Sequence, residues 1–127
     1  MNREIKFRGK NYENKWKYGD LVQEKWKQGK AIMIKKETTA WSVLEDTVGQ
    51  YTGLHDKNGK EIYEGDIVKI KYRDEDIGKV IYEHNGFSID VTNMNKNYRR
   101  VSFVDNFIEV IGNIYENPEL LGGMNGI

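Results

Sequence analysis

A tight-turn signal between strand-forming residues constrains this chain more than any other feature of its sequence. Asn58-Gly59 is the strongest short-range indication of a β-hairpin, because both residues tolerate the positive φ angles of a tight turn. β-Branched and aromatic residues lie on both sides of it within Val48–Ile70. Gly65-Asp66 predicts a second turn, after which a new strand begins at Ile67. The centre of the chain is therefore predicted to be β-structure.

Alternation of apolar and charged residues predicts further strands on both sides of this stretch. Trp16 and Tyr18 are expected to share one buried strand face, with the neighbouring lysines on the other. Residues 67–72 are predicted to form the clearest strand, with Val68, Ile70 and Tyr72 inward. Further strands are expected over residues 5–8, 15–18, 31–34, 41–43, 101–107 and 109–115.

One later hairpin also has a predicted register. With Asn85-Gly86 as a two-residue turn, Tyr82 lies opposite Ile89 and Val80 lies opposite Val91. This register puts the apolar pairs together on one face, which favours it over a slip by one residue. Tyr82 is therefore expected to be buried.

The end of the chain carries a helix-start pattern. Asn117-Pro118-Glu119 provides an N-cap, a proline at the first helical position and an acid in the first turn. Leu120-Leu121 is expected to pack this short turn onto the β-structure. We expect a single domain over residues 1–121 and a flexible tail over 122–127.

Three blocks of this sequence resemble the YopX family of small proteins encoded by bacteriophages and prophages. They are residues 48–68, residues 3–10 with Trp16-Lys17-Tyr18-Gly19 behind them, and residues 110–121. The resemblance implies an all-β, SH3-like barrel, partly open or closed, with hairpin extensions. It implies no established activity, so no catalytic residue is carried over.

Charge is distributed unevenly along a chain with a formal net charge of zero. Residues 1–36 hold 11 Lys/Arg and 4 Asp/Glu, whereas residues 37–127 hold 9 and 16. Such asymmetry can mark a basic binding face. The alternative, which we favour, is that opposite charges meet on neighbouring strands and neutralise each other.

Cysteine is absent, which excludes disulfides, thiolate metal sites and cysteine nucleophiles. The longest apolar run, Ala31–Ile34, is too short to span a membrane, and the start of the chain has no apolar segment typical of a signal peptide. We therefore expect a cytoplasmic protein of the bacterial host cell with no membrane association.

Motifs for catalysis or cofactor binding fail on their spacing. Gly53–Glu61 has one residue too many for a phosphate-binding loop and lacks its hydroxyl, and Asp56–Gly59 places its glycine wrongly for a calcium loop. His55 and His84 are expected in exposed turns, too few for a structural zinc site. We predict no catalytic, cofactor or metal residues; a small hydrolytic enzyme ranks third among the functions considered.

Two clusters of cations around an aromatic residue are candidate partner-binding sites. They are Lys25-Trp26-Lys27 and Tyr98-Arg99-Arg100. Exposed aromatics among cations are typical of surfaces that stack single-stranded nucleic acid. The alternative, which we favour, is a tryptophan packed under its own loop. The leading prediction is a non-catalytic module that binds an unknown protein, and the alternative is a single-stranded nucleic-acid-binding β-barrel.

Overall fold

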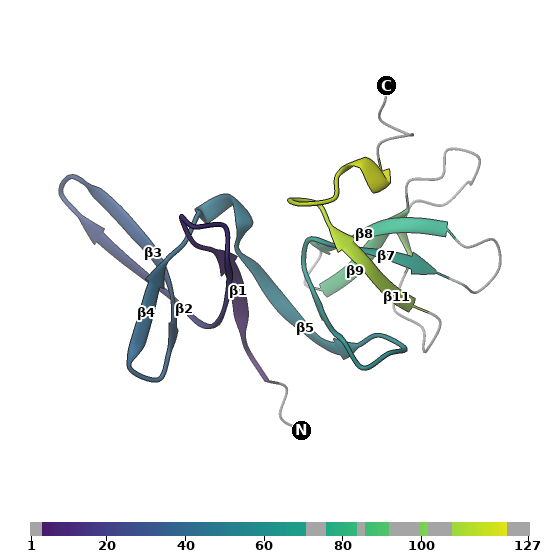
Figure 1. Ribbon diagram of the computed structural model, residues 1–127, viewed down its shortest axis with the longest axis horizontal. Coiled ribbons are helices and arrows are strands. Elements are labelled where there is room, and N and C mark those ends of the chain that lie inside the picture. The colour runs from purple at the N-terminus through teal and green to yellow at the C-terminus, as the bar shows by residue number, and fades with distance from the viewer. Residues whose placement is uncertain (1–3, 71–75, 84–85, 92–99, 102–107, 122–127) are drawn as a thin grey trace. The chain divides into compact units, whose positions relative to one another are not determined.

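The computed structural model describes residues 4–70, 76–83, 86–91, 100–101 and 108–121. These residues are mainly β, as predicted, and form two antiparallel sheets (Figure 1). The chain divides into two compact units, Met1–Gly53 and Leu54–Ile127, called here the N-terminal and C-terminal units. The prediction of one domain over residues 1–121 stays a prediction.

The N-terminal unit is built on successive antiparallel hairpins. The strands of its sheet follow the order β4-β3-β2-β1-β5-β6, in which β6 (Glu61–Tyr63) belongs to the C-terminal unit. Strand β5 begins in the N-terminal unit and ends in the C-terminal unit. The elements are β1 (Phe7–Lys10), β2 (Trp16–Trp26), β3 (Gly29–Lys36), β4 (Thr39–Ser42), the 3₁₀ helix η1 (Glu45–Thr47) and β5 (Gly49–His55).

Few apolar side chains of β2, β3 and β4 are fully buried. Ile34 and Val43 are 0% and 3% exposed. Gly9 lies so close to Val43 that a Cβ added at Gly9 would be 3.0 Å from the Cγ2 atom of Val43. Leu21 and Met33, in contrast, are only half-buried. Among the described residues of this unit, the buried apolar side chains are therefore few: Ile34, Val43 and Tyr51 of β5, which is 3% exposed.

Cations contact the aromatic side chains on this sheet. The Arg8 guanidinium lies 4.5 Å from the ring centroid of Trp16, and the Lys17 ammonium lies 4.7 Å from that of Trp41. Trp16 is half-buried and Tyr18 is 41% exposed, so the prediction that both are core residues is wrong. Alternation identified their shared face, but a face can be contacted by long cationic side chains and still remain partly open to water.

The C-terminal unit contains a five-stranded sheet with the order β10-β9-β8-β7-β11. A cluster of buried aliphatic side chains from five strands forms its core: Ile62, Val68, Ile70, Val80, Ile89, Val91 and Ile108. The strands are β6 (Glu61–Tyr63), β7 (Asp66–Ile70), β8 (Asp76–Glu83), β9 (Gly86–Val91), β10 (Arg100–Val101) and β11 (Ile108–Asn113).

Strand β7 lies at the centre of this packing. Val68 and Ile70 are buried, as predicted, whereas Tyr72 lies outside the described residues. Ile67, on the opposite face of the strand, is also 0% exposed. Both faces of β7 are therefore covered at this point, a feature that simple alternation does not predict.

The predicted register of the β8–β9 hairpin is wrong by two residues. Val80 pairs with Ile89 and Tyr82 pairs with Phe87, so the strands are joined through residues 84–85 rather than through Asn85-Gly86. A shift of two keeps every side chain on its predicted face, which is why the apolar pattern did not exclude it. Tyr82 lies beyond the core and is 49% exposed, which corrects its predicted burial.

The predicted turns at the two ends of this unit are present. Gly59 has a φ of +85°, as the Asn58-Gly59 hairpin requires. Near the C-terminus a short helical turn places Leu121 at 8% exposure, as expected. The described residues contain no closed barrel. The tail over 122–127 lies outside the described residues.

Candidate functional site

The β2–β3 hairpin extends beyond the strands that flank it (Figure 1). β1 pairs with β2 only at Trp16–Gly19, and β4 pairs with β3 only at Met33–Lys36. The tip, residues 24–31, is therefore a two-stranded ribbon that ends where Trp26 pairs with Gly29. Because a two-stranded ribbon offers little interior, Trp26 is 59% exposed.

A second aromatic side chain is held by the turn after β1. The Asn11 side-chain oxygen accepts hydrogen bonds from the backbone N–H groups of Glu13 and Lys15, both at 2.9 Å. The Lys15 carbonyl oxygen accepts the Asn11 N–H at 2.9 Å, which closes the turn. Tyr12 lies at the corner of this turn and is 73% exposed.

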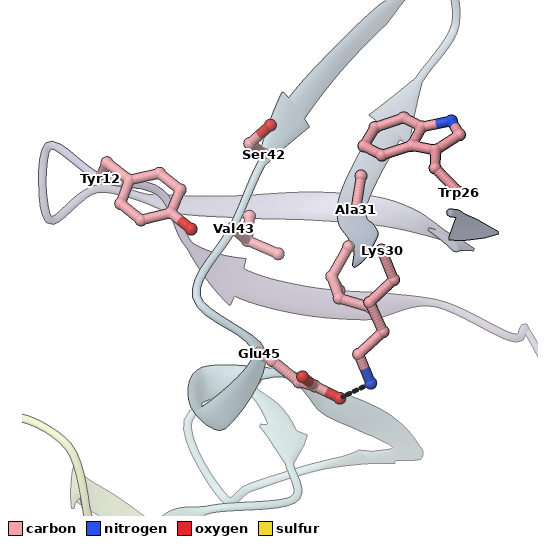
Figure 2. A pocket seen from close by; sticks show the side chains of 8 residues that line it. Tyr12, Trp26, Lys30, Ala31, Ser42, Val43 and Glu45 are labelled. Atoms are coloured by element: carbon pink, nitrogen blue, oxygen red, sulfur yellow. Dashed lines mark hydrogen bonds and ion pairs between the residues drawn. The ribbon is translucent and has the colours of Figure 1, made fainter. Parts of the chain in front are cut away.

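Trp26 and Tyr12 border a surface hollow with a volume of about 410 Å³ (Figure 2). Ala31, Ile32 and Val43 supply its apolar lining, and the Ser42 side chain also borders it. We call this site the Trp26 hollow; its full lining is Tyr12, Trp26, Lys30, Ala31, Ile32, Ser42, Val43 and Glu45.

An ion pair lies at one side of the Trp26 hollow. The Lys30 ammonium is 3.0 Å from a carboxylate oxygen of Glu45 (Figure 2). The two side chains are 48% and 58% exposed, so water screens the pair and its contribution to stability is under about 1 kcal/mol. The pair can therefore be exchanged at low cost for contacts with a charged ligand.

The lining of the hollow suits recognition by contact. Tryptophan and tyrosine offer large contact areas together with a polar group, and both are enriched where proteins bind partners. Small aliphatic side chains lie between them, and the charged groups lie to one side. This arrangement resembles the centre and rim of a protein interface on a small scale.

The structure places the first predicted cluster at this site. Lys25, Trp26 and Lys27 are all exposed at the hairpin tip, so the alternative of a tryptophan packed under its own loop is wrong. Lys25 pairs with Lys30 across the hairpin, which adds a third cation to the tip. Sequence reasoning missed Tyr12, Lys30, Ser42 and Glu45, and the turn signal Gly9-Lys10-Asn11 was the available indication for Tyr12.

Of the second predicted cluster, only Arg100 lies among the described residues. Tyr98 and Arg99 lie outside the described residues. Arg100 begins β10 of the C-terminal unit, where its backbone pairs with Asp90, and its side chain is outside the description. Its predicted role in partner binding stays a prediction.

The central turn motif uses its acidic side chains to hold backbone. Asp56 is 8% exposed, and its carboxylate accepts the N–H groups of Asn58, Lys60 and Val110 at 2.8–2.9 Å. Burial raises the pKa of Asp56, but these hydrogen bonds and the charge of Lys60 outweigh that effect and lower the pKa below 3.8. Asp56 therefore fastens the β5–β6 turn to β11.

Asp66 has a comparable role in the next turn. It is 1% exposed and accepts the Tyr63 N–H at 2.7 Å. Gly65 between them has a φ of +96° and lies against the Tyr115 ring, where an added Cβ would come within 3.0 Å. The residues that make the motif recognisable in sequence are thus explained by turn geometry.

Within the described part of the chain, no group of three or more His, Cys, Asp or Glu side chains is placed to hold a metal ion. No helix there is long and apolar enough to cross a bilayer. His55 is exposed near the β5–β6 turn, as predicted, and His84 lies outside the described residues.

Comparison with known proteins places the chain in a family. A region of 72 residues is 40% identical to the SPbeta prophage-derived uncharacterized protein YopX of Bacillus subtilis strain 168, covering 52% of this chain and 54% of that protein. The match thus spans about half the length of this curated relative. The crystal structure of protein EF1440 from Enterococcus faecalis is similar with a TM-score of 0.52 at 25% identity, covering 94% of this chain and 99% of that one. Because the profile of the YopX protein family matches residues 6–122, the chain belongs to the YopX family.

Proposed function

We propose that this protein is a non-catalytic interaction module that binds another protein through the Trp26 hollow. The observation that carries the proposal is the exposure of Trp26, at 59%, on a protruding hairpin beside a hollow that is also bordered by Tyr12. Exposing a large aromatic side chain to water forgoes the free energy of its burial. A partner that covers Trp26 and Tyr12 recovers that free energy in the complex.

The cellular setting follows from the relative. The Bacillus subtilis protein is prophage-derived by its name, and we extend that origin to this chain. The partner is then a protein in the cytoplasm of the bacterial host. The SH3-like barrel also stays a proposal; in the N-terminal unit it is supported by the bridge between Asn11 and Val43, which joins the segment after β4 to the end of β1.

Single-stranded nucleic acid is the second candidate. Trp26 is flanked by Lys25 and Lys27, and this combination of a stacking surface and cations favours nucleic acid. The apolar lining from Ala31, Ile32 and Val43 adds contact area for a protein side chain, which ranks a protein first.

Site-specific photocrosslinking tests the proposal in host cells. Trp26 is replaced by the photoreactive residue benzoylphenylalanine, and Tyr82, which is also an exposed aromatic residue but lies in the C-terminal unit, is replaced in a matched control. We expect a discrete adduct from position 26 whose size nuclease does not change. Adducts that are equal from both positions would overturn the proposal, and a nuclease-sensitive adduct from position 26 would establish the second candidate.

A further inference from the structure

One strand edge opens beside the Trp26 hollow. The Ile32 carbonyl oxygen accepts the Val43 N–H at 3.0 Å, which extends the β3–β4 pairing by one residue pair. The next N–H along, that of Leu44, donates instead to the Lys10 carbonyl oxygen at 2.8 Å, and η1 then begins at Glu45. The chain that follows β4 therefore leaves β3 before it reaches Lys30.

Alternation along β3 fixes where the backbone groups of Lys30 point. In an antiparallel ladder the N–H and C=O groups of one residue point to the same side, and those of every second residue share that side. Since Ile32 directs its carbonyl group toward the β4 side, the backbone groups of Lys30 are directed to the same side. The Glu45 side chain binds the Lys30 ammonium, not the Lys30 backbone.

An edge of this kind accepts an extended peptide. Main-chain hydrogen bonds align the added strand, and a pocket beside the edge selects one of its side chains. Here the Lys30 backbone supplies the edge, and the Trp26 hollow is the pocket beside it. A volume of about 410 Å³ accommodates a large apolar side chain together with part of its neighbours.

Charge complementarity defines the peptide further. Lys25, Lys27 and Lys30 are exposed at the hairpin tip, where Glu24 is the acidic neighbour within the hairpin. The whole N-terminal unit holds 11 Lys/Arg and 7 Asp/Glu over residues 1–53. An acidic segment is therefore attracted to this surface, and its carboxylate can replace Glu45 as the partner of Lys30.

We propose that the Trp26 hollow binds an extended acidic segment of a partner protein. The segment pairs with the β3 edge at Lys30 and inserts one large apolar side chain between Trp26 and Tyr12. This inference rests on the proposed function and specifies its partner class and recognition mode.

Selection from two random libraries tests the proposal with the full chain. A displayed library of dodecapeptides and a library of single-stranded oligonucleotides are selected in parallel on the wild-type chain, on Trp26→Ala and on Tyr82→Ala. We expect peptides with one large apolar residue flanked by Asp or Glu, retained by wild type and Tyr82→Ala and weakened at least tenfold by Trp26→Ala. The best peptide is then synthesised with a single N-methyl group at each position in turn, which removes one backbone donor at a time.

Strand pairing predicts a position-specific result. N-methylation at the one peptide residue opposite Lys30 should weaken binding about tenfold, whereas methylation of its two neighbours, whose N–H groups point away, should have little effect. The double variant Lys25→Gln, Lys27→Gln should bind the acidic peptide several-fold more weakly, and its affinity should depend less on salt concentration.

The possible outcomes distinguish a failure of this inference from a failure of the proposed protein-binding function. Peptides that depend on Trp26 but lack acidic residues, or that show no position-specific effect of N-methylation, would overturn the acidic-strand inference and leave the protein-binding function standing. Enrichment of oligonucleotides alone, or of peptides that Trp26→Ala retains equally, would overturn both.

Discussion

The N-terminal and C-terminal units differ in where their large side chains lie. All three tryptophans of the chain belong to the N-terminal unit, where Trp26 is exposed and Trp16 and Trp41 are half-buried. The C-terminal unit instead buries a contiguous aliphatic cluster from β6, β7, β8, β9 and β11. The tryptophans of this chain therefore remain partly open to water, whereas the aliphatic cluster of the C-terminal unit is closed to water and contributes to stability.

The two units also use acidic side chains differently. In the C-terminal unit, Asp56 and Asp66 are buried and accept backbone hydrogen bonds across turns. In the N-terminal unit, Lys30 and Glu45 form an exposed pair beside the Trp26 hollow. Buried charged hydrogen bonds are costly to break, whereas exposed pairs are readily exchanged. The C-terminal unit is therefore suited to hold the fold and the N-terminal unit to contact a partner.

The largest expected effect comes from the aliphatic core. Ile89→Ala should lower the free energy of unfolding by about 2–5 kcal/mol, because Ile89 is 0% exposed and truncating its side chain leaves a cavity in the core. Ile32→Ala is the matched change in the N-terminal unit, where the side chain is half-buried, and its cost should be clearly smaller. Chemical denaturation of both variants measures the difference, and equal costs would contradict the contrast between the units.

Asp56→Ala should be the next most costly change. It leaves the N–H groups of Asn58, Lys60 and Val110 without their acceptor, and we expect a loss of about 2–4 kcal/mol. Glu13→Ala, in an exposed turn of the N-terminal unit, is the control and should be near neutral in the same denaturation experiment.

The same carboxylate makes stability depend on acid. The pKa of Asp56 in the folded protein is lowered below 3.8, so folding favours the ionised form. Its contribution is fully present above about pH 5 and is lost as the pH falls through about 4 toward the folded-state pKa. Asp56→Asn should therefore flatten the acid limb of a stability–pH profile, and an unchanged limb would show that another group controls it.

Two glycines separate backbone strain from crowding. Gly59→Ala should cost about 1–2 kcal/mol, because its φ is +85° and the space around an added Cβ is open. Gly65→Ala should cost more, since its φ is +96° and the Cβ would come within 3.0 Å of the Tyr115 ring. Thermal unfolding of both variants gives the order, and a smaller cost at Gly65 would mean that Tyr115 moves aside freely.

The smallest expected effect is at the proposed binding site. Trp26→Ala should change the free energy of unfolding by no more than about 0.5 kcal/mol, because the side chain is 59% exposed. Tyr63→Ala provides the opposite case in the C-terminal unit, where the ring is 2% exposed and its removal should cost several times as much. A large loss of stability in Trp26→Ala would show that Trp26 has a structural role instead of a binding role.

Local signals in the sequence predicted the turns and the strand faces well. Asn58-Gly59 and Asn117-Pro118-Glu119 specify their own backbone geometry, so both turns were predicted with residue precision. The burial of Val68 and Ile70 on β7 and the faces of the β8–β9 hairpin followed from alternation. The β8–β9 register did not, because apolar alternation is unchanged by a shift of two residues.

Only part of the Trp26 hollow could be predicted from the sequence. Lys25-Trp26-Lys27 stood out as cations around an aromatic residue, and the structure exposes all three. Tyr12 and Glu45 reach the same hollow only because Asn11 bridges to Val43 and brings two separate turns together. Such long-range pairing depends on the whole sheet, and no local pattern encodes it.

Amide hydrogen exchange of the free, full-length protein tests the contrast between the two units most directly. Amides in the core of the C-terminal unit, at Val68, Val80 and Ile89, should exchange only through global unfolding. Amides of the hairpin tip, from Glu24 to Ala31, should exchange orders of magnitude faster, since local opening of a two-stranded ribbon exposes them. Protection at the hairpin tip equal to that of the C-terminal core would contradict the account, because it would make the tip part of the stable scaffold.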